Sequence, residues 1–387
     1  MNHLQITKGS SFDINGENLY NYVQNNLRSA KIINIIDNKR ATIENMSNLF
    51  MNHPSLQSID LSELNTANVT NVSQMFHPCN NLYYVADFDT SNVSNFYYMF
   101  YWCMRYNFTT PPDLNISNAT DLRGMFAFCV NFRTVPNFGK YNTLKVKDIS
   151  SLYEECWKIT SVPYFDTSNV INMRQTFAGC SNLTSIPNYN TSNVVNMGGM
   201  FFNCNNLTIV PNFDTSKVTY MYSMFWGCNN LTTVPNFDTS NVTNFGGIFG
   251  SCFNLEQVPN WDMNNITYRG MDGMYRNCYK LTSVPNINTS KLTSMSNVFT
   301  NCINLVDIPQ FDTTNVTFAM QLCANCNNLS NASVQNVINM YLNSNITKSN
   351  YKNLQVNNQY SPFYNSNITS SKYSNRLSEL TAAGWIY

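Results

Sequence analysis

The feature that most constrains this chain is the regular spacing of its cysteines. Eleven of the twelve recur at steps of 24 to 27 residues, and only Cys323 lies outside the series. The eleven are Cys79, Cys103, Cys129, Cys156, Cys180, Cys204, Cys228, Cys252, Cys278, Cys302 and Cys326. A unit of this length buries little surface alone and folds by stacking on its neighbours. The sequence therefore predicts one array of repeats.

A clean copy of the repeat occupies residues 213–236. It reads Phe-Asp-Thr-Ser-Lys-Val-Thr-Tyr-Met-Tyr-Ser-Met-Phe-Trp-Gly-Cys-Asn-Asn-Leu-Thr-Thr-Val-Pro-Asn. The apolar residues up to the cysteine are spaced by three and one, which predicts one stripe of a short helix. The stripe contains Val218, Met221, Met224, Phe225 and Cys228.

The residues after the cysteine indicate a short strand. Leu231 and Val234 are apolar, and Pro235 follows them. Proline suits a strand end because it donates no hydrogen bond to the ladder. The sequence therefore predicts an α/β solenoid of about twelve coils of ~24 residues, with one short parallel strand and one short helix in each coil.

Two further columns follow from the repeat. Aspartates such as Asp214 are expected to form Asx turns or N-caps, because a short side-chain oxygen accepts free backbone N–H groups. The equivalents of Asp214 are Asp89, Asp166, Asp238 and Asp312, with Asn190 and Asn288 in the same role. An aromatic column is expected to fill the core: Phe50, Phe76, Phe100, Phe126, Tyr153, Phe177, Phe201, Phe225, Phe249, Tyr275 and Phe299.

The two ends lack the repeat and define three segments. Residues 1–40 are predicted to form an N-terminal cap or docking segment, with a helix over 18–29 and a strand over 31–36. Residues 41–329 form the repeat solenoid. Residues 330–387 form a C-terminal helical cap or docking segment, with helices over 333–342 and 377–383 and with Ser330 or Asn331 as an N-cap. An exposed terminal coil would leave apolar surface and an open strand edge, which explains the need for caps.

Charge and hydropathy exclude several classes of partner. Twenty-two basic residues balance twenty-two acidic ones, so no long-range field attracts nucleic acid or an anionic membrane. The sequence contains no stretch of 18 consecutive apolar residues, so no membrane-spanning helix is predicted. The N-terminus lacks the basic and apolar regions of a secretory signal, so no secretion signal is recognised.

The repeat resembles the BspA-like leucine-rich repeat surface proteins. Residues 231–254 carry the motif Leu-Thr-x-Val-Pro-x-Phe-Asp-Thr-Ser-Asn-Val-Thr-Asn-Met with its later Phe-x-x-Cys, although Phe245 replaces the methionine. The match covers roughly residues 41–329 and implies a leucine-rich-repeat-like fold. It also implies a surface protein of gut Bacteroides-type bacteria or their phages that adheres to proteins or host surfaces. A virion or extracellular surface location is therefore expected.

The cysteine column admits a chemical and a structural interpretation. Disulfides, metal sites and reactive thiols are the chemical ones, whereas cysteine is also a small buried hydrophobe. Its place on the apolar stripe favours packing, so free thiols are predicted. Cys323-Ala-Asn-Cys326 has the spacing of a redox or zinc motif. No second pair or nearby histidine completes four ligands, so packing is favoured there too, and no metal or cofactor is expected.

An active site is not evident. His3, His53 and His77 are the only histidines, which leaves few general bases. Carboxylate pairs for glycoside hydrolysis are compatible with the spacing, but the aspartate column is explained by turns. Calcium binding is an alternative role for the same aspartates. Each coil supplies only one carboxylate, however, whereas calcium takes six to eight oxygen ligands.

Aromatic residues that break the repeat are the best candidates for binding. They stand where other coils carry Thr, Ser, Gly or Asn, and exposed aromatic side chains concentrate binding energy. Local core packing is the alternative. The candidate binding residues are Tyr83, Tyr84, Tyr97, Tyr98, Tyr101, Trp102 and Tyr106.

The sequence as a whole predicts a non-enzymatic repeat protein that presents an extended surface for recognition or adhesion. The expected partner is a protein or glycan on a cell surface, or other virion proteins, and the setting is a phage virion or a bacterial surface. A purely structural spacer within a larger assembly is the alternative. A carbohydrate-active enzyme is the third hypothesis.

Overall fold

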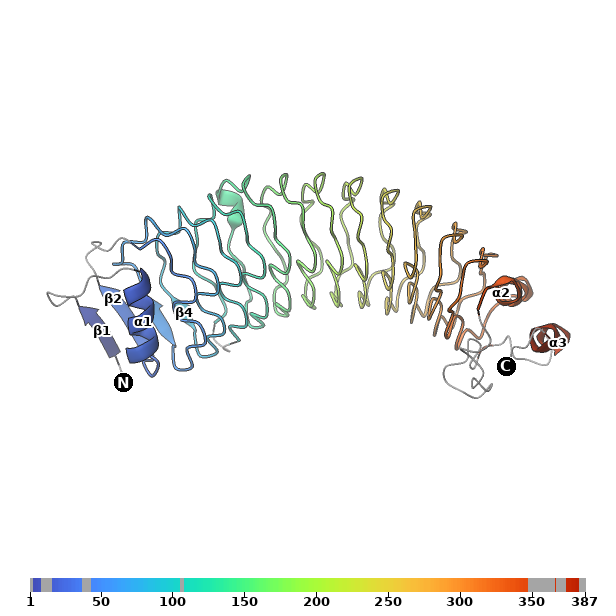
Figure 1. The fold of residues 1–387 in the computed structure, drawn as a ribbon, viewed down its shortest axis with the longest axis horizontal. Coiled ribbons are helices and arrows are strands. Elements are labelled where there is room, and N and C mark those ends of the chain that lie inside the picture. Colours follow the sequence, from blue (N-terminus) through green and yellow to red (C-terminus); the bar gives the residue numbers. More distant parts are fainter. Residues whose placement is uncertain are drawn as a thin grey trace. The chain divides into compact units, whose positions relative to one another are not determined.

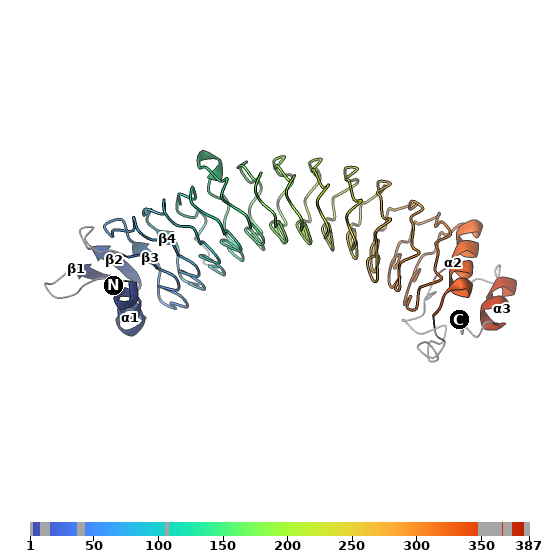
Figure 2. The same ribbon diagram turned by 45° about the horizontal axis from the view of Figure 1, so that its top comes forward.

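The structure is a computed structural model that describes residues 3–7, 16–36, 43–104, 108–346, 366 and 374–382. The chain divides into two compact units, Met1–Val194 and Val195–Tyr387. Within each unit, successive coils lie side by side (Figure 1, Figure 2). The predicted solenoid of stacked coils is confirmed in both units.

The N-terminal end of the first unit forms a parallel sheet. Strand β1 (His3–Thr7) is followed by helix α1 (Gly16–Asn26), strand β2 (Ile32–Ile36), strand β3 (Ser58–Asp60) and strand β4 (Tyr84–Val85). The order in the sheet is β1-β2-β3-β4, as Figure 2 shows. The predicted helix and second strand are confirmed, whereas β1 was not predicted. The boundary at residue 40 stays a prediction.

The segment before each cysteine is not helical, so the predicted helix in each coil is wrong. We call residues 221–228 and their equivalents the turn segment. Met224 N–H donates to the carbonyl oxygen of Met221 at 3.1 Å, and Cys228 N–H donates to that of Phe225 at 3.0 Å. These are i to i+3 turns. Ser223 has a φ of 52°, and this left-handed conformation prevents continuation as an α-helix.

Alternate amides of the turn segment join neighbouring coils. Phe225 N–H donates to the carbonyl oxygen of Ile248 at 3.0 Å, and Gly227 N–H to that of Gly250 at 2.8 Å. The same segment therefore forms turns within its own coil and strand-like hydrogen bonds with the next coil. The parallel bridges of most coils lie where this segment begins, as between Tyr220 and Asn244.

We call the residues after the cysteine, such as 231–234, the strand segment. β3 and β4 lie in this segment, and a single bridge joins Ser283 to Asp307. In the other described coils the strand segment forms no named strand. The prediction of one strand per coil at this place therefore holds only for the first coils.

Buried polar side chains join the coils from within. Each thiol of the cysteine column for which a contact is resolved donates to the carbonyl oxygen of the preceding coil's aromatic residue, as from Cys228 Sγ to Phe201 at 3.2 Å. Buried threonines do the same on another side of the coil. Thr215 Oγ1 donates to the carbonyl oxygen of Asp238 at 2.7 Å. Each hydroxyl of this column for which a contact is resolved thus pairs with a backbone carbonyl oxygen, which would be costly to bury without a partner.

The predicted columns are confirmed. Asp214 Oδ1 accepts Ser216 N–H at 3.1 Å, and Asp238 Oδ1 accepts Ser240 N–H at 3.0 Å, which are Asx turns. The aromatic rings stack within each unit. The ring centroids of successive residues lie 5.1 to 6.0 Å apart, from Phe50 to Phe177 in the first unit and from Phe201 to Phe299 in the second.

The C-terminal end of the second unit carries two helices, α2 (Asn331–Asn343) and α3 (Ser374–Ala382). Ser330 is the N-cap of α2, and its side chain accepts Ser333 N–H, as predicted. Thr313 Oγ1 donates to the carbonyl oxygen of Met340 at 2.6 Å. Helix α2 thus takes the place of a further coil and satisfies the last threonine of the column.

One core residue leaves a polar group without a partner. The hydroxyl of Tyr153 is buried in the aromatic column and has no hydrogen-bond partner among the residues that the structure describes. Burial raises the pKa of Tyr153 well above its ordinary value. Phenylalanine occupies this position in most coils, which keeps the ring and removes the cost.

Tyr153→Phe is expected to raise the free energy of unfolding by about 1 kcal/mol, because it removes an unpaired buried hydroxyl. Urea unfolding followed by circular dichroism measures this. The matched control is Tyr189→Phe, which loses a 2.8 Å bond from the hydroxyl to the carbonyl oxygen of Pro163 and should lower stability. Destabilisation by both changes would contradict the assignment.

His53 replaces cysteine in the first coil and joins it to the N-terminal segment. Its Nδ1 accepts Leu56 N–H at 3.0 Å, and its Nε2 lies 2.8 Å from the carbonyl oxygen of Leu27. Both contacts are satisfied by the neutral ring with its proton on Nε2. Burial is the largest cause that lowers the pKa of His53.

A lowered histidine pKa makes stability depend on pH. The unfolded chain binds more protons than the folded chain below pH 6.5, so this contribution is full above that pH and is lost as the pH falls through the folded-state pKa. We expect the free energy of unfolding to fall more between pH 7.5 and 5.5 in the wild type than in His53→Cys. Urea titrations at the two pH values test this, and an equal fall in both proteins would contradict it.

Candidate functional site

The predicted aromatic residues lie in two different segments of the coil. Tyr97, Tyr98, Tyr101 and Trp102 belong to a turn segment, whereas Tyr83 and Tyr84 belong to the preceding strand segment. Among the described residues no ring contact joins the two groups. Tyr106 lies outside the described residues. We call the first group the turn cluster and treat the two groups as separate candidate sites.

The turn cluster is a continuous set of ring contacts. Tyr97 and Tyr98 stack with centroids 4.2 Å apart, and Tyr98 lies 4.5 Å from Tyr101. Trp102 stacks on Phe128 of the next coil at 5.4 Å. The three tyrosines are half-buried and Trp102 is 44% exposed. The cluster therefore combines local packing with an accessible edge.

The turn cluster places bulky residues at two positions of left-handed backbone that recur along the repeat. Tyr98 and Trp102 have φ values of 53° and 64°, in the left-handed region that bulky residues rarely adopt. The ring of Tyr98 lies against the next coil at Gly124, where an added Cβ would come within 1.8 Å of it. A glycine in one coil thus makes room for an aromatic ring from another.

Charged groups flank the turn cluster. The guanidinium of Arg123 lies 4.8 Å from the ring centroid of Tyr97, which is a cation–π contact. Burial first, and the charge of Glu154 further, raise the pKa of Tyr98 and Tyr101. His77 is half-buried, and its Nδ1 lies 3.0 Å from the carbonyl oxygen of Tyr101.

The second candidate site is a hollow of about 480 Å³ in the first unit, which we call the tyrosine hollow. Tyr83 and Tyr84 line it and are 36% and 52% exposed. The other lining residues come from the same coil and the next one: Val85, Asp87, Thr109, Thr110, Pro111, Pro112 and Asp113. An aromatic wall thus faces carboxylate and hydroxyl groups.

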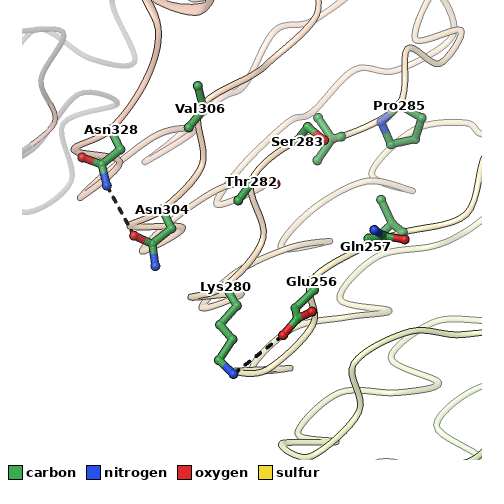
Figure 3. A pocket seen from close by; sticks show the side chains of 11 residues that line it. Glu256, Gln257, Lys280, Thr282, Ser283, Pro285, Asn304, Val306 and Asn328 are labelled. Atoms are coloured by element: carbon green, nitrogen blue, oxygen red, sulfur yellow. Dashed lines mark hydrogen bonds and ion pairs between the residues drawn. The ribbon is translucent and has the colours of Figure 1, made fainter.

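The second unit has a larger hollow of about 1070 Å³ in the same segments of later coils (Figure 3). It lacks aromatic residues. Lys280 Nζ lies 3.8 Å from Glu256 Oε1, and Asn328 Nδ2 donates to Asn304 Oδ1 at 3.4 Å. Both members of the ion pair are more than half exposed, so the pair adds little stability. Its walls mix polar side chains with valine and proline and bring together no set of groups with an evident chemistry.

The sequence interpretation missed aromatic residues in the second unit. Tyr220, Tyr222 and Tyr268 are each more than half exposed. An added Cβ on Gly250 would lie 2.1 Å from the ring of Trp226, which repeats the ring-over-glycine arrangement of Tyr98. Departures from the repeat do not identify Tyr220, Tyr222 and Trp226, because these residues belong to the clean copy that defines the repeat.

No catalytic or metal-binding arrangement is evident in the part of the chain that the structure describes. No group of three or more His, Cys, Asp or Glu side chains there could hold a metal ion. No described helix is long and apolar enough to cross a membrane. Cys323 and Cys326 are buried, and burial raises the pKa of Cys323 well above its usual range. Their predicted packing role is confirmed.

Stacked parallel coils of about 24 residues, each with an apolar column and short turns, define a leucine-rich-repeat-like solenoid. The chain belongs to the DUF285 family, described as "Mycoplasma protein of unknown function". The family model matches six overlapping stretches: residues 17–135, 80–162, 120–210, 147–257, 208–305 and 251–375. No curated protein matches the chain.

Solved structures similar to the chain are leucine-rich repeat proteins. One, from Eubacterium ventriosum ATCC 27560, is 16% identical, with 79% of this chain and 85% of that chain covered and a TM-score of 0.43. An LRR protein from Leptospira interrogans is 11% identical, with 87% of this chain and 100% of that chain covered and a TM-score of 0.21.

The thiol column should be chemically inert in the folded protein. All twelve cysteines are free and buried, and burial raises the pKa of Cys79 to about 12. Because the thiolate is the reactive form, iodoacetamide at pH 8 is expected to label none of them within an hour without denaturant and all of them in urea. Intact-mass spectrometry counts the labels. Rapid labelling of several native thiols would refute the packing role.

Proposed function

We propose that the chain is a non-enzymatic recognition protein that presents exposed aromatic side chains to a protein or glycan on a cell surface. The observation that carries the proposal is the residue type of Tyr98 and Trp102, because they occupy two positions of left-handed backbone that most other described coils fill with glycine or a small or polar residue. Holding a bulky residue there costs free energy of the order of 1 kcal/mol, and such strain concentrates at functional sites. Neighbouring coils use residues such as Gly124 and Gln175 at the position of Tyr98.

Charge and repeat type favour this class of function. The balanced charge suits an uncharged partner surface better than nucleic acid. Tyrosine and tryptophan supply much contact area with few rotamers to immobilise. The BspA-like resemblance of the repeat supports a place on a phage virion or a bacterial surface, where the partner is a cell-surface protein or glycan.

The test compares cell binding with stability. The variant Tyr98→Ser/Trp102→Asn introduces residue types that other coils carry at these positions. Fluorescently labelled protein is incubated with intact gut Bacteroides strains and with cultured epithelial cells, and binding is read by flow cytometry. We expect saturable binding to at least one cell type and a loss of tenfold or more in the variant, because a pair of aromatic anchors is removed.

The melting temperature is the control for folding. Relief of backbone strain offsets the lost ring contacts, so a shift below about 4 °C is expected, equivalent to roughly 1 kcal/mol. Leu144→Ser, at another exposed apolar residue of the first unit, should bind like the wild type. Absence of binding by the wild type would favour a structural spacer. Equal binding by wild type and double variant would contradict the role of the turn cluster, and a collapse of the melting temperature would identify the cluster as core.

A further inference from the structure

Several residues that line the tyrosine hollow depart from the repeat. The clean copy carries Thr232 and Thr233 where this coil carries Tyr83 and Tyr84. Asp87 and Asp113 stand at the position of Asn236, which is asparagine in most coils. Pro111 replaces the valine of the strand segment. Aromatic, acidic and rigid residues are thus introduced together, in two adjacent coils and around one hollow.

An insertion in the following coil fixes one of the two carboxylates. The step from Cys129 to Cys156 is 27 residues, and the three added residues are 139–141. They lie in and directly after a short 3-10 helix, η1 (Phe138–Lys140). Lys140 Nζ donates to Asp113 Oδ2, and Tyr141 Oη donates to Asp113 Oδ1 at 3.2 Å. Gly139 lets the inserted residues pack closely on the following coil, since an added Cβ would lie 2.4 Å from the carbonyl oxygen of Tyr164.

The second carboxylate keeps an oxygen available. Asp87 is exposed, and its Oδ1 accepts Asp113 N–H at 3.1 Å. Among the described residues, no hydrogen bond to its Oδ2 is found. The backbone contact orients the carboxylate in the wall of the hollow. A ligand hydroxyl can therefore donate to Asp87 Oδ2 without displacing a protein contact.

We propose that the tyrosine hollow binds a neutral saccharide. Sugar rings offer an apolar C–H face to an aromatic ring and hydroxyl donors to a carboxylate, and Tyr83, Tyr84 and Asp87 supply both kinds of partner. A hollow of about 480 Å³ is within the range of small-molecule sites. Because Lys140 compensates Asp113, the hollow carries about one uncompensated negative charge. A single negative charge favours a neutral ligand over a polycationic one, which binds to several carboxylates.

This inference rests on the proposed recognition function and names its ligand class at a second place. The test uses the full chain. Binding is screened on an array of neutral glycans and then measured by calorimetry with the strongest neutral oligosaccharide. Tyr83→Thr/Tyr84→Thr restores the repeat's own residues, so the fold is expected to persist. The matched control is Ile209→Thr, since Ile209 holds the position of Tyr84 in a later coil and is 66% exposed.

Wild type and Ile209→Thr should bind the same neutral oligosaccharide equally, and the tyrosine variant should bind at least tenfold more weakly with an unchanged melting temperature. The affinity should change less than twofold between 50 and 500 mM NaCl, because no ion pair is formed. Failure of every neutral glycan to bind would overturn the proposal. So would binding that survives in the tyrosine variant.

A cationic protein partner is the competing occupant, and it gives a different result. An arginine-rich peptide would then bind the hollow, with an affinity that falls steeply with salt and is lost in Asp87→Asn. That outcome overturns the saccharide proposal and leaves recognition intact. Failure of the recognition function itself is read separately, from the absence of saturable binding of the wild type to any of the tested cells.

Discussion

The structure depends on hydrogen bonds between successive coils. Alternate amides of each turn segment donate to the carbonyl oxygens of the next coil, as Phe225 does to Ile248. Threonine hydroxyls and cysteine thiols add further bonds to buried backbone oxygens. Because each coil supplies hydrogen-bond partners for backbone groups of its neighbour, a terminal coil without a neighbour leaves polar groups unpaired. This requirement fixes the residue types of the repeat and accounts for helix α2, which receives the last threonine hydroxyl.

The same requirement separates structure from function along the sequence. Residues that point into the stack are nearly invariant from coil to coil, and they explain the cysteines, the aromatic column and the aspartates without any chemistry. Residues that point outward are free to differ. The turn cluster and the tyrosine hollow arise where outward positions receive tyrosine, tryptophan or aspartate. In the turn cluster this occurs at a cost, because Tyr98 and Trp102 occupy left-handed backbone.

Local patterns were predictable and distant ones were not. The Asx turn of Asp214 and the N-cap of Ser330 depend on residues two or three positions away, and both were predicted. The sequence predicts a helix in the turn segment because an i to i+3 spacing is common to helices and to successive turns. Only the positive φ of residues such as Ser223 distinguishes them. Strand β1 was missed because its pairing with β2 crosses the whole of α1.

The candidate sites show the same limit. A search for departures from the repeat found Tyr83, Tyr84 and the turn cluster, although it treated them as one surface. It could not predict that Lys140 and Tyr141 reach Asp113, which lies 27 and 28 residues earlier in the chain. It passed over Tyr220 and Tyr222 because they belong to the copy taken as the standard. The sequence signal for this contact is the insertion of residues 139–141 in the coil that follows Asp113.

The most direct test of this account is one variant measured twice. All six described candidates, Tyr83, Tyr84, Tyr97, Tyr98, Tyr101 and Trp102, are returned together to residues that neighbouring coils carry at those positions. The melting temperature and the binding to intact cells are then compared with those of the wild type. The account predicts a folded chain that melts cooperatively within a few degrees of the wild type and no longer binds. An unfolded variant, or one that binds as the wild type does, would contradict it.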